Sequence, residues 1–334
     1  MRYFGKTGMK IKRVGFGGIP IQRISQEDTN KVIDELEKCG VNFIDTARGY
    51  TVSEEYLGNA LKGRREKFYI ATKSMSRDYE SMKRDIEISL KNLQTDYIDL
   101  YQMHNVKPAE YDTLFCEDKA YRALLEAKEQ GKIKHIGITS HGLETVEKAV
   151  ESDKFETIQF PYNIVENQTD EVFKRAYEKG VGTIVMKPLA GGAIDDGTLA
   201  MKYLLSREYI DVAIPGMDSP QQVIENTDVL QNYELTEEDN KKIAKIKSEL
   251  GTNFCRRCEY CLPCPKGINI PQNFLLEGYY NRYNLKDWAV DRYRGLAENE
   301  RASNCIECGA CQKKCPYELP IIDMLKKVVD TLEK

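Results

Sequence analysis

The feature that most constrains the fold is a repeated alternation, over the first 250 residues, between short apolar runs and longer amphipathic segments. Segments such as TNKVIDELEKCG (29–40) and TDEVFKRAYEKG (169–180) have helical periodicity and end in glycine, the usual residue after the last turn of a helix. The apolar runs resemble parallel strands that are buried on both faces. Eight such units in about 250 residues predict an α/β fold, a (β/α)8 TIM barrel. The runs are VGFGG (14–18), NFIDTA (42–47), FYIATK (68–73), YIDLYQMH (97–104), IKHIGITS (133–140), TIQFPYN (157–163), GTIVMKP (182–188) and VAIPGM (212–217).

An open, doubly wound sheet is the alternative arrangement of the same elements. It is disfavoured because no G-x-G-x-x-G fingerprint follows the first apolar run. The opening segment MRYFGKTGMKIK (1–12) has a glycine at its centre and predicts a small hairpin that closes the floor of the barrel.

Eight of the ten cysteines lie in two tight runs, CRRCEYCLPCP (255–265) and CIECGACQKKCP (305–316). The second run has the bacterial ferredoxin spacing C-x2-C-x2-C-x3-C-P, in which three cysteines hold one iron–sulfur cluster and the fourth holds the other. The first run ends one residue shorter, at Cys264. The runs predict two 4Fe–4S clusters, with crossed ligation, whose ligands are Cys255, Cys258, Cys261, Cys264, Cys305, Cys308, Cys311 and Cys315.

A single cluster, structural zinc and disulfides are the alternatives for these cysteines. Zinc sites seldom use four cysteines in one continuous run, and disulfides need an oxidising compartment that nothing at the N-terminus indicates. The composition changes at Gly251, after a charged helical segment. We therefore expect a barrel over residues 1–250 and a small, mainly helical, ferredoxin-like domain over 251–334.

Charge and hydropathy narrow the range of partners. The net charge of −4 gives no electrostatic reason to expect nucleic acid. No run approaches the roughly 20 apolar residues that cross a bilayer, so we expect no membrane and a cytoplasmic location.

Four polar residues mark the carboxyl ends of successive predicted strands, the edge where TIM barrels carry their active sites. Asp45, Lys73 and His104 end three neighbouring runs, and Tyr50 follows the first of them in a loop. Each alone has an ordinary structural interpretation, as a cap, a packing residue or a surface cation. Their occurrence together at one edge indicates a reaction site.

The segments around these residues resemble the aldo-keto reductase family. FIDTARGY with SEEYLGNAL resembles the signature around the family's Asp and Tyr, and IATKS and DLYQMH resemble the segments of its Lys and His. The resemblance spans residues 1 to about 250. It implies that Tyr50 donates a proton, that Lys73 and Asp45 tune it, and that His104 positions a substrate carbonyl. In physical terms, a nearby ammonium lowers the pKa of a phenol, and a neutral imidazole can donate a hydrogen bond to the carbonyl.

The segments GITSH, TIQFPYN, VMKPLAGG and IPGM with ENT resemble the family's nicotinamide-binding segments. The resemblance implies that Ser140, His141 and Gln159 meet the nicotinamide amide. The full set of implied cofactor contacts is Ser140, His141, Gln159, Met186, Lys187, Pro188, Leu189, Gly191, Pro215, Gly216, Gln222 and Asn226.

Two positions depart from the family pattern. Gly216 and Gln222 stand where members that prefer NADPH carry basic residues, which favours NADH over NADPH unless Lys187 or an arginine of the cysteine-rich domain compensates. Met186 stands where many members place an aromatic side chain against the nicotinamide, a surface that a methionine can also provide.

The barrel and the cysteine-rich tail together resemble an iron–sulfur subgroup of the family. The first hypothesis is an NAD(P)H-dependent oxidoreductase that interconverts a small carbonyl and an alcohol, with clusters that are structural or exchange electrons with a redox partner protein. The alternative is an electron-transfer or redox-sensing protein in which the barrel is a docking module. Hydride transfer moves two electrons and each cluster moves one, and no flavin motif links them.

Overall fold

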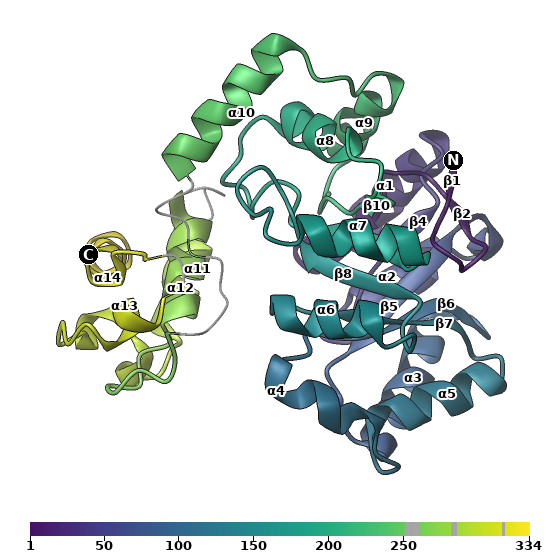
Figure 1. Ribbon diagram of the computed structural model, residues 1–334, viewed down its shortest axis with the longest axis horizontal. Coiled ribbons are helices and arrows are strands. Elements are labelled where there is room, and N and C mark those ends of the chain that lie inside the picture. Colours follow the sequence, from purple (N-terminus) through teal and green to yellow (C-terminus); the bar gives the residue numbers. More distant parts are fainter. Residues whose placement is uncertain (251–254, 256–260, 282–285, 316–317) are drawn as a thin grey trace. The chain divides into compact units, whose positions relative to one another are not determined.

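The computed structural model describes residues 1–250, 255, 261–281, 286–315 and 318–334 (Figure 1). The chain divides into two compact units, Met1–Asn240 and Lys241–Lys334. The division falls inside helix α10 (Glu237–Leu250), ten residues before the expected domain boundary at 250. Gly251, where the composition changes, lies outside the described residues.

The first unit is a (β/α)8 barrel. Eight strands pair in parallel in chain order, β3 to β10, and β10 also meets the beginning of the sheet. The amide of Gly15 donates to the carbonyl of Ala213 and that of Gly17 to Pro215, each at 2.9 Å, so the sheet closes on itself. All eight apolar runs contain a strand, as predicted. The strands are β3 (Phe16–Gly17), β4 (Phe43–Asp45), β5 (Tyr69–Ser74), β6 (Ile98–Met103), β7 (Ile133–Thr139), β8 (Thr157–Pro161), β9 (Gly182–Met186) and β10 (Val212–Ala213).

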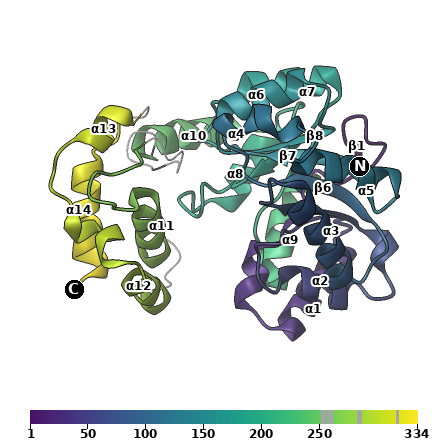
Figure 2. The same ribbon diagram turned by 90° about the horizontal axis from the view of Figure 1, so that it is seen from below.

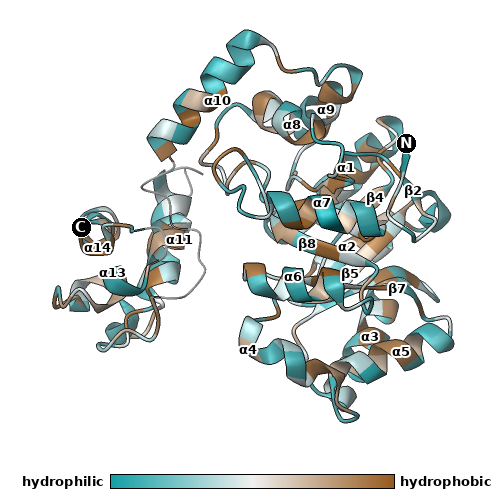
Figure 3. Ribbon diagram, in the orientation of Figure 1, coloured by the Kyte–Doolittle hydropathy of each residue, from teal (hydrophilic) through white to brown (hydrophobic). Residues whose placement is uncertain are grey.

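Helices surround the strands (Figures 1 and 2). Their inward faces are apolar and their outward faces polar, as the alternating colours of α7 show beside the largely apolar β8 (Figure 3). Side-chain caps begin several of them: the Ser25 hydroxyl accepts from the amide of Asp28, and the Asp78 carboxylate from that of Ser81. The helices are α1 (Gln26–Lys38), α2 (Ser53–Ala60), α3 (Tyr79–Leu93), α4 (Pro108–Tyr111), α5 (Ala120–Glu129), α6 (Leu143–Glu151), α7 (Asp170–Lys179), α8 (Gly197–Leu205) and α9 (Pro220–Asp228).

A hairpin closes the amino-terminal end of the barrel, as predicted. Strands β1 (Arg2–Tyr3) and β2 (Lys10–Ile11) pair in antiparallel fashion. The fully buried Phe4 that follows β1 packs edge-on against Phe43, with ring centres 5.5 Å apart. A Cβ at Gly182 would lie 2.5 Å from the Phe4 ring, so this close approach requires glycine at the start of β9. Side chains of the hairpin thus fill the amino-terminal end of the barrel, and the carboxyl edge is the end at which a reaction site can form.

The second unit is mainly helical in its described part. Its core is formed by apolar side chains from the helices and the segments between them, among them Ile268, Phe274, Tyr293, Leu325 and Val328. The described cysteines of both runs, except the exposed Cys308, lie in this core or pack against it. None of the helices in the described ranges of the chain is both long and apolar enough to cross a membrane. The further helices are α11 (Ile270–Asn281), α12 (Lys286–Arg294), α13 (Ala310–Lys314) and α14 (Ile321–Leu332).

Candidate active site

A buried ion pair lies at the carboxyl edge of the barrel. Asp45 ends β4, Lys73 lies near the end of the neighbouring β5, and the two side chains are 2% and 1% exposed. The Lys73 Nζ is 2.5 Å from the Asp45 Oδ1 and 2.7 Å from the carbonyl oxygen of Thr46. Burial acts to lower the pKa of Lys73, but the charge of Asp45 and the nearby Tyr50 outweigh it and raise that pKa. Lys73 is therefore an ammonium inside the barrel.

Tyr50 is carried by the loop between β4 and α2. The loop is fixed at its ends, because the Ser53 hydroxyl lies 2.8 Å from that of Thr46 and donates to the carbonyl of Gly18 at 3.1 Å. The centre of the Tyr50 ring is 4.9 Å from the Lys73 Nζ and 5.9 Å from the centre of the His104 ring. The four predicted catalytic side chains thus gather at one place.

The net shift of the Tyr50 pKa differs from the sequence-based expectation. Burial raises the pKa of Tyr50, and the Lys73 ammonium only partly opposes this rise. The physical reason is that the surrounding protein disfavours the charged phenolate more than one neighbouring cation favours it. Tyr50 therefore keeps its proton until a proton acceptor binds beside it.

His104 follows β6 and is kept neutral. Burial, with the charges of Lys73 and Arg77, lowers the pKa of His104 to about 3. Arg77 also fixes the backbone here, because its Nη2 donates to the carbonyl of His104 at 2.8 Å. The buried Nδ1 of His104 has no hydrogen-bond partner within the described part of the chain. An uncharged imidazole next to Tyr50 suits the polarisation of a carbonyl.

Sequence reasoning missed Gln102, the last residue but one of β6. It is fully buried, and its Nε2 is 3.1 Å from the Asp45 Oδ2 and 3.0 Å from the Gln159 Oε1. The available signal was an amide inside the apolar run YIDLYQMH, because a buried amide needs polar partners. The network joins the Lys73–Asp45 pair to a residue expected on the cofactor side.

A second buried carboxylate, Glu54, was also missed, although it belongs to the motif SEEYLGNAL. It is 1% exposed and accepts hydrogen bonds from Thr72 and Ser89 at 2.7 Å and from Arg48 at 2.6 Å. Arg48 lies in the loop that carries Tyr50, and its amide donates to the carbonyl of Lys73 at 2.9 Å. Glu54 therefore holds the loop that carries Tyr50 through its contact with Arg48.

The residues expected at the nicotinamide lie on the same edge. Ser140 follows β7, fully buried, and its hydroxyl donates to the carbonyl of Val106 at 2.6 Å and accepts from the amide of Gly142 at 2.9 Å. The hydroxyl can therefore accept one further bond but cannot donate one. His141 lies next to it, and its Nδ1 is 3.5 Å from the Lys187 Nζ.

The loop after β9 turns tightly on itself. Met186 ends the strand, Pro188 is buried, and Leu189 accepts from the amide of Gly192 at 2.8 Å. The backbone is left-handed at Lys187, Ala190, Gly191 and Gly192, with φ values of 57°, 51°, 67° and 83°. Such a loop exposes backbone groups next to the rim, where a dinucleotide could contact them.

The segment after β10 carries the last expected contacts. A Cβ at Gly216 would lie 2.8 Å from the ring of Pro20, so no larger residue fits without a shift. Pro215 accepts from Gly17 in the barrel closure. The Gln222 Oε1 accepts from the amide of Asp218 at 2.8 Å, and the Asn226 Nδ2 donates to the carbonyl of Gln222 at 2.8 Å.

Asp218 places an acidic group just before α9. Its carboxylate pairs with Arg23, whose Nη2 is 3.1 Å from the Asp218 Oδ2. The only guanidinium that approaches the start of α9 among the described contacts is therefore already matched by a carboxylate. The sequence signal for this acidic group is Asp218–Ser219 ahead of Pro220. Sequence reasoning considered only that this segment lacks basic residues.

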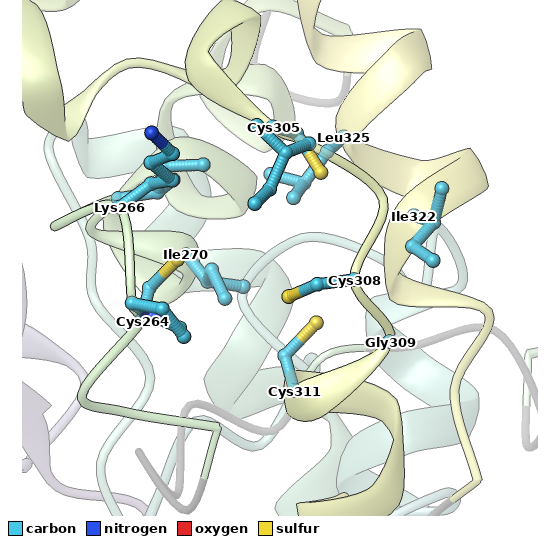
Figure 4. Close-up of a pocket in the computed structure, with 12 residues that line it drawn as sticks. Cys264, Lys266, Ile270, Cys305, Cys308, Gly309, Cys311, Ile322 and Leu325 are labelled. Carbon is cyan, nitrogen blue, oxygen red and sulfur yellow. The ribbon is translucent and has the colours of Figure 1, made fainter.

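In the second unit, cysteines of both runs line one pocket (Figure 4). Cys264 approaches from one side, and Cys305, Cys308 and Cys311 approach from the other. Ile268, Ile270, Ile322 and Leu325 contribute apolar side chains to the lining, and Lys266 also lines the pocket. The described side chains do not form a ready-made group of three metal ligands. Four thiols around one apolar pocket nevertheless have the donor chemistry of an iron–sulfur site.

The remaining cysteines of the runs lie in the same unit. Cys261 belongs to its buried core, and Cys255 and Cys315 pack against that core. Cys258 lies outside the described residues. Cys308 is exposed, whereas Cys311 is buried.

Comparison with known proteins adds to this geometry. The sequence profile described as "Aldo/keto reductase family" matches residues 13–198, and the one described as "4Fe-4S dicluster domain" matches residues 254–320. The chain thus combines a barrel similar to aldo/keto reductases with a C-terminal iron–sulfur domain.

Individual relatives agree with the family match. L-galactose dehydrogenase of Arabidopsis thaliana is 26% identical over 75% of this chain and 94% of its own length. Methylglyoxal reductase DkgA of Escherichia coli is 29% identical over 69% of this chain and 88% of its own length. Among solved structures, the holo form of aldo-keto reductase AKR11C1 from Bacillus halodurans superposes with a TM-score of 0.65, at 26% identity, over 73% of this chain and 95% of its own.

Proposed function

The chain belongs to the aldo/keto reductase family, and from this premise we propose that it catalyses hydride exchange between a nicotinamide dinucleotide and the carbon of a small carbonyl or alcohol. The observation that carries the proposal is the gathering of Tyr50, His104 and the Lys73–Asp45 pair at one place on the carboxyl edge of the barrel. The intact set favours an enzyme over a barrel that serves only for docking.

The residues present fit a nicotinamide dinucleotide. The resemblance assigns Ser140 and Gln159 to the amide of the nicotinamide. The left-handed loop after β9 and the start of α9 lie on the same edge of the barrel as these two residues. When bound, the reduced dinucleotide supplies a hydride to the carbonyl carbon.

The chain's own residues handle the proton. As the carbon–oxygen double bond opens and the carbon gains a hydride, Tyr50 gives its hydroxyl proton to the oxygen, and an alcohol forms. Burial holds that proton on Tyr50 beforehand, and the Lys73 ammonium stabilises the phenolate that is left. Neutral His104 hydrogen-bonds the carbonyl oxygen. Alcohol oxidation runs through the same groups in reverse.

We assign NADH as the preferred cofactor. A 2′-phosphate brings about two negative charges and requires a free cation or an arginine fork. The segment before α9 offers Gly216, Gln222 and an Asp218–Arg23 pair that is already neutral. A carboxylate here repels a phosphate but can accept a hydrogen bond from a ribose hydroxyl.

We also propose that the second unit holds two 4Fe–4S clusters with crossed ligation. Support comes from the pocket that Cys264 of the first run shares with Cys305, Cys308 and Cys311 of the second. The other cluster would take Cys255, Cys258 and Cys261 with Cys315. Such clusters supply one-electron transfer when bound. Because Cys308 is exposed, a redox partner protein can approach the cluster held there.

The test is turnover of a panel of aldehydes and ketones with NADH and NADPH by the anaerobically purified chain. We expect reduction by the wild type, and a loss of roughly 10²–10⁴-fold in Tyr50→Phe, which removes the proton donor. Cofactor affinity, measured by fluorescence titration, should remain nearly unchanged in this variant. A loss of less than tenfold with a substrate that the wild type reduces would rule out Tyr50 as the donor.

A further inference from the structure

Gln102 is a buried amide whose hydrogen bonds are only partly satisfied. Its Nε2 contacts Asp45 and Gln159, at 3.1 and 3.0 Å, but its Oε1 is buried without a hydrogen-bond partner in the described chain. A buried carbonyl without a partner costs stability, whereas an apolar side chain of the same size would not. The amide is therefore retained for what its two N–H groups hold.

The backbone leaves room for this contact. Strand β7 lies between β6 and β8, and Gly137 is the β7 residue that pairs with Gln102. A Cβ at Gly137 would lie 3.1 Å from the Gln102 Cγ and 2.2 Å from the Thr157 Oγ1. Without a side chain at Gly137, Gln102 can reach across β7 to Gln159.

We propose that Gln102 is a positioning residue that couples the nicotinamide side of the site to the proton-donating side, by holding Gln159 and Asp45 in one hydrogen-bonded arrangement. The inference rests on the proposed function, because it takes Gln159 as a nicotinamide contact and Tyr50 as the proton donor.

On the proton-donating side, Gln102 supports the charge of Asp45. Lys73 donates to the Asp45 Oδ1, Gln102 donates to its Oδ2, and Gln159 also hydrogen-bonds this carboxylate. Hydrogen bonds to a carboxylate favour its charged form, and a buried ion pair depends on them. Without Gln102, the pair shifts towards its neutral form, in which Lys73 carries no charge.

The acidity of Tyr50 depends on the charge of the Lys73–Asp45 pair. The ionisable groups that face it are Lys73 from β5, Asp45 from β4 and His104 from the end of β6. Lys73 acts on Tyr50 more strongly than Asp45 does. Neutralising the pair therefore makes Tyr50 a weaker acid, while His104 stays uncharged.

On the nicotinamide side, Gln102 fixes the orientation of Gln159. The Gln159 Oε1 accepts from Gln102, so the Gln159 amino group is the part of the amide that donates to Asp45. If the Gln159 amide were rotated by a half turn, its N–H groups would face the N–H group of Gln102. A carboxamide bound at Gln159 therefore meets one defined donor, the Gln159 amino group. The other partner of this amino group is the Asp45 carboxylate, which pairs with Lys73.

The test is Gln102→Met, which keeps the volume and removes the amide. We expect kcat for carbonyl reduction to fall roughly tenfold, and the pH above which reduction declines to rise by about half a unit or more. Nicotinamide affinity should weaken several-fold. Gln159→Leu should weaken affinity too, and the double variant should lose less than the product of the two single losses.

Thr157→Val is the matched control. Thr157 is fully buried on β8, and its Oγ1 has no hydrogen-bond partner among the residues described. Its replacement should leave the pH profile and cofactor affinity unchanged. The inference is overturned if Gln102→Met behaves like this control, or if Gln159→Leu weakens affinity without any shift in the pH profile.

Failure of the coupling can be told from failure of the proposed function. If the wild type reduces no carbonyl, the proposed function fails, and the cofactor titrations of Gln102→Met and the double variant still decide the coupling. If Gln102→Met does not fold, Gln102→Asn, which keeps the amide but draws it back by one methylene, should show the same changes. Multiplicative losses in the double variant would overturn the inference in either case.

Discussion

Burial decides how single residues behave at the rim of this barrel. Tyr50 and His104 lie side by side, and the loss of water pushes the pKa of one up and of the other down. Both shifts favour the uncharged form, so the phenol keeps its proton and the imidazole accepts none. Only the Lys73–Asp45 pair remains charged, because each ion has its partner at 2.5 Å. One ion pair beside two neutral groups is the arrangement that carbonyl reduction needs.

A pH-dependent stability follows from His104. Its pKa is about 3 in the folded chain and 6.5 ordinarily, so below pH 6.5 the unfolded chain binds a proton that the folded chain does not. Folding is therefore weakened as the pH falls from 7 to 5, by about 2 kcal/mol at pH 5. We expect His104→Gln to remove this loss. Thermal unfolding followed by circular dichroism measures this. Between pH 7 and pH 5, the Tm of the variant should fall by several degrees less than the Tm of the wild type. Parallel melting curves across that range would contradict a buried neutral imidazole.

At the scale of elements, the proposed preference for NADH rests on the start of α9. Asp218 and Ser219 precede the helix, and Gln222 binds back to the amide of Asp218 at 2.8 Å. Arg23, the nearby cation, comes from the 3₁₀ turn after β3 and is paired with Asp218. The element therefore offers oxygen acceptors and a neutral ion pair where a phosphate would need net positive charge.

We predict that NADH binds at least as tightly as NADPH, and that Gln222→Arg strengthens NADPH binding about tenfold or more, roughly 1.4 kcal/mol. Fluorescence titration of both dinucleotides measures this. Gln221→Arg, one residue earlier on the exposed face of α9, adds the same charge in a different direction and should change the preference little. A wild type that prefers NADPH by more than about 30-fold, roughly 2 kcal/mol, would show that another group holds the phosphate.

At the scale of the whole molecule, two units with different chemistry share one chain. The barrel carries the site proposed for two-electron hydride exchange, and the second unit gathers cysteines from two runs 41 residues apart at Cys264 and Cys305. In the proposed crossed arrangement, each cluster depends on both runs. Loss of one cysteine should therefore affect the cluster of the other run.

We predict that the anaerobically purified chain carries about eight irons and that Cys264→Ser damages the cluster of Cys305, Cys308 and Cys311. Cys315→Ser should damage the cluster of the first run. Iron and sulfide analysis with electron paramagnetic resonance of the reduced protein distinguishes the two signals. Cys116→Ser, at an exposed cysteine outside both runs, is the control and should keep all the iron. Loss of the same signal in Cys264→Ser and Cys258→Ser would mean that each run binds its own cluster.

The sequence by itself determined the barrel, its floor and the four residues of the candidate tetrad, because these depend on local patterns. A buried strand is read from its own residues, and Asp45, Lys73 and His104 share an edge in any parallel barrel. The spacing of the cysteines likewise predicted an iron–sulfur domain from short segments. Only the tertiary structure decided the contacts between side chains of different elements and the pKa shifts that depend on burial. The contact of Gln102 with Gln159 across Gly137, the pairing of Asp218 with Arg23 and the upward shift of the Tyr50 pKa each depend on residues distant in the chain. Burial and contact across strands are properties of packing, and no local pattern contains them.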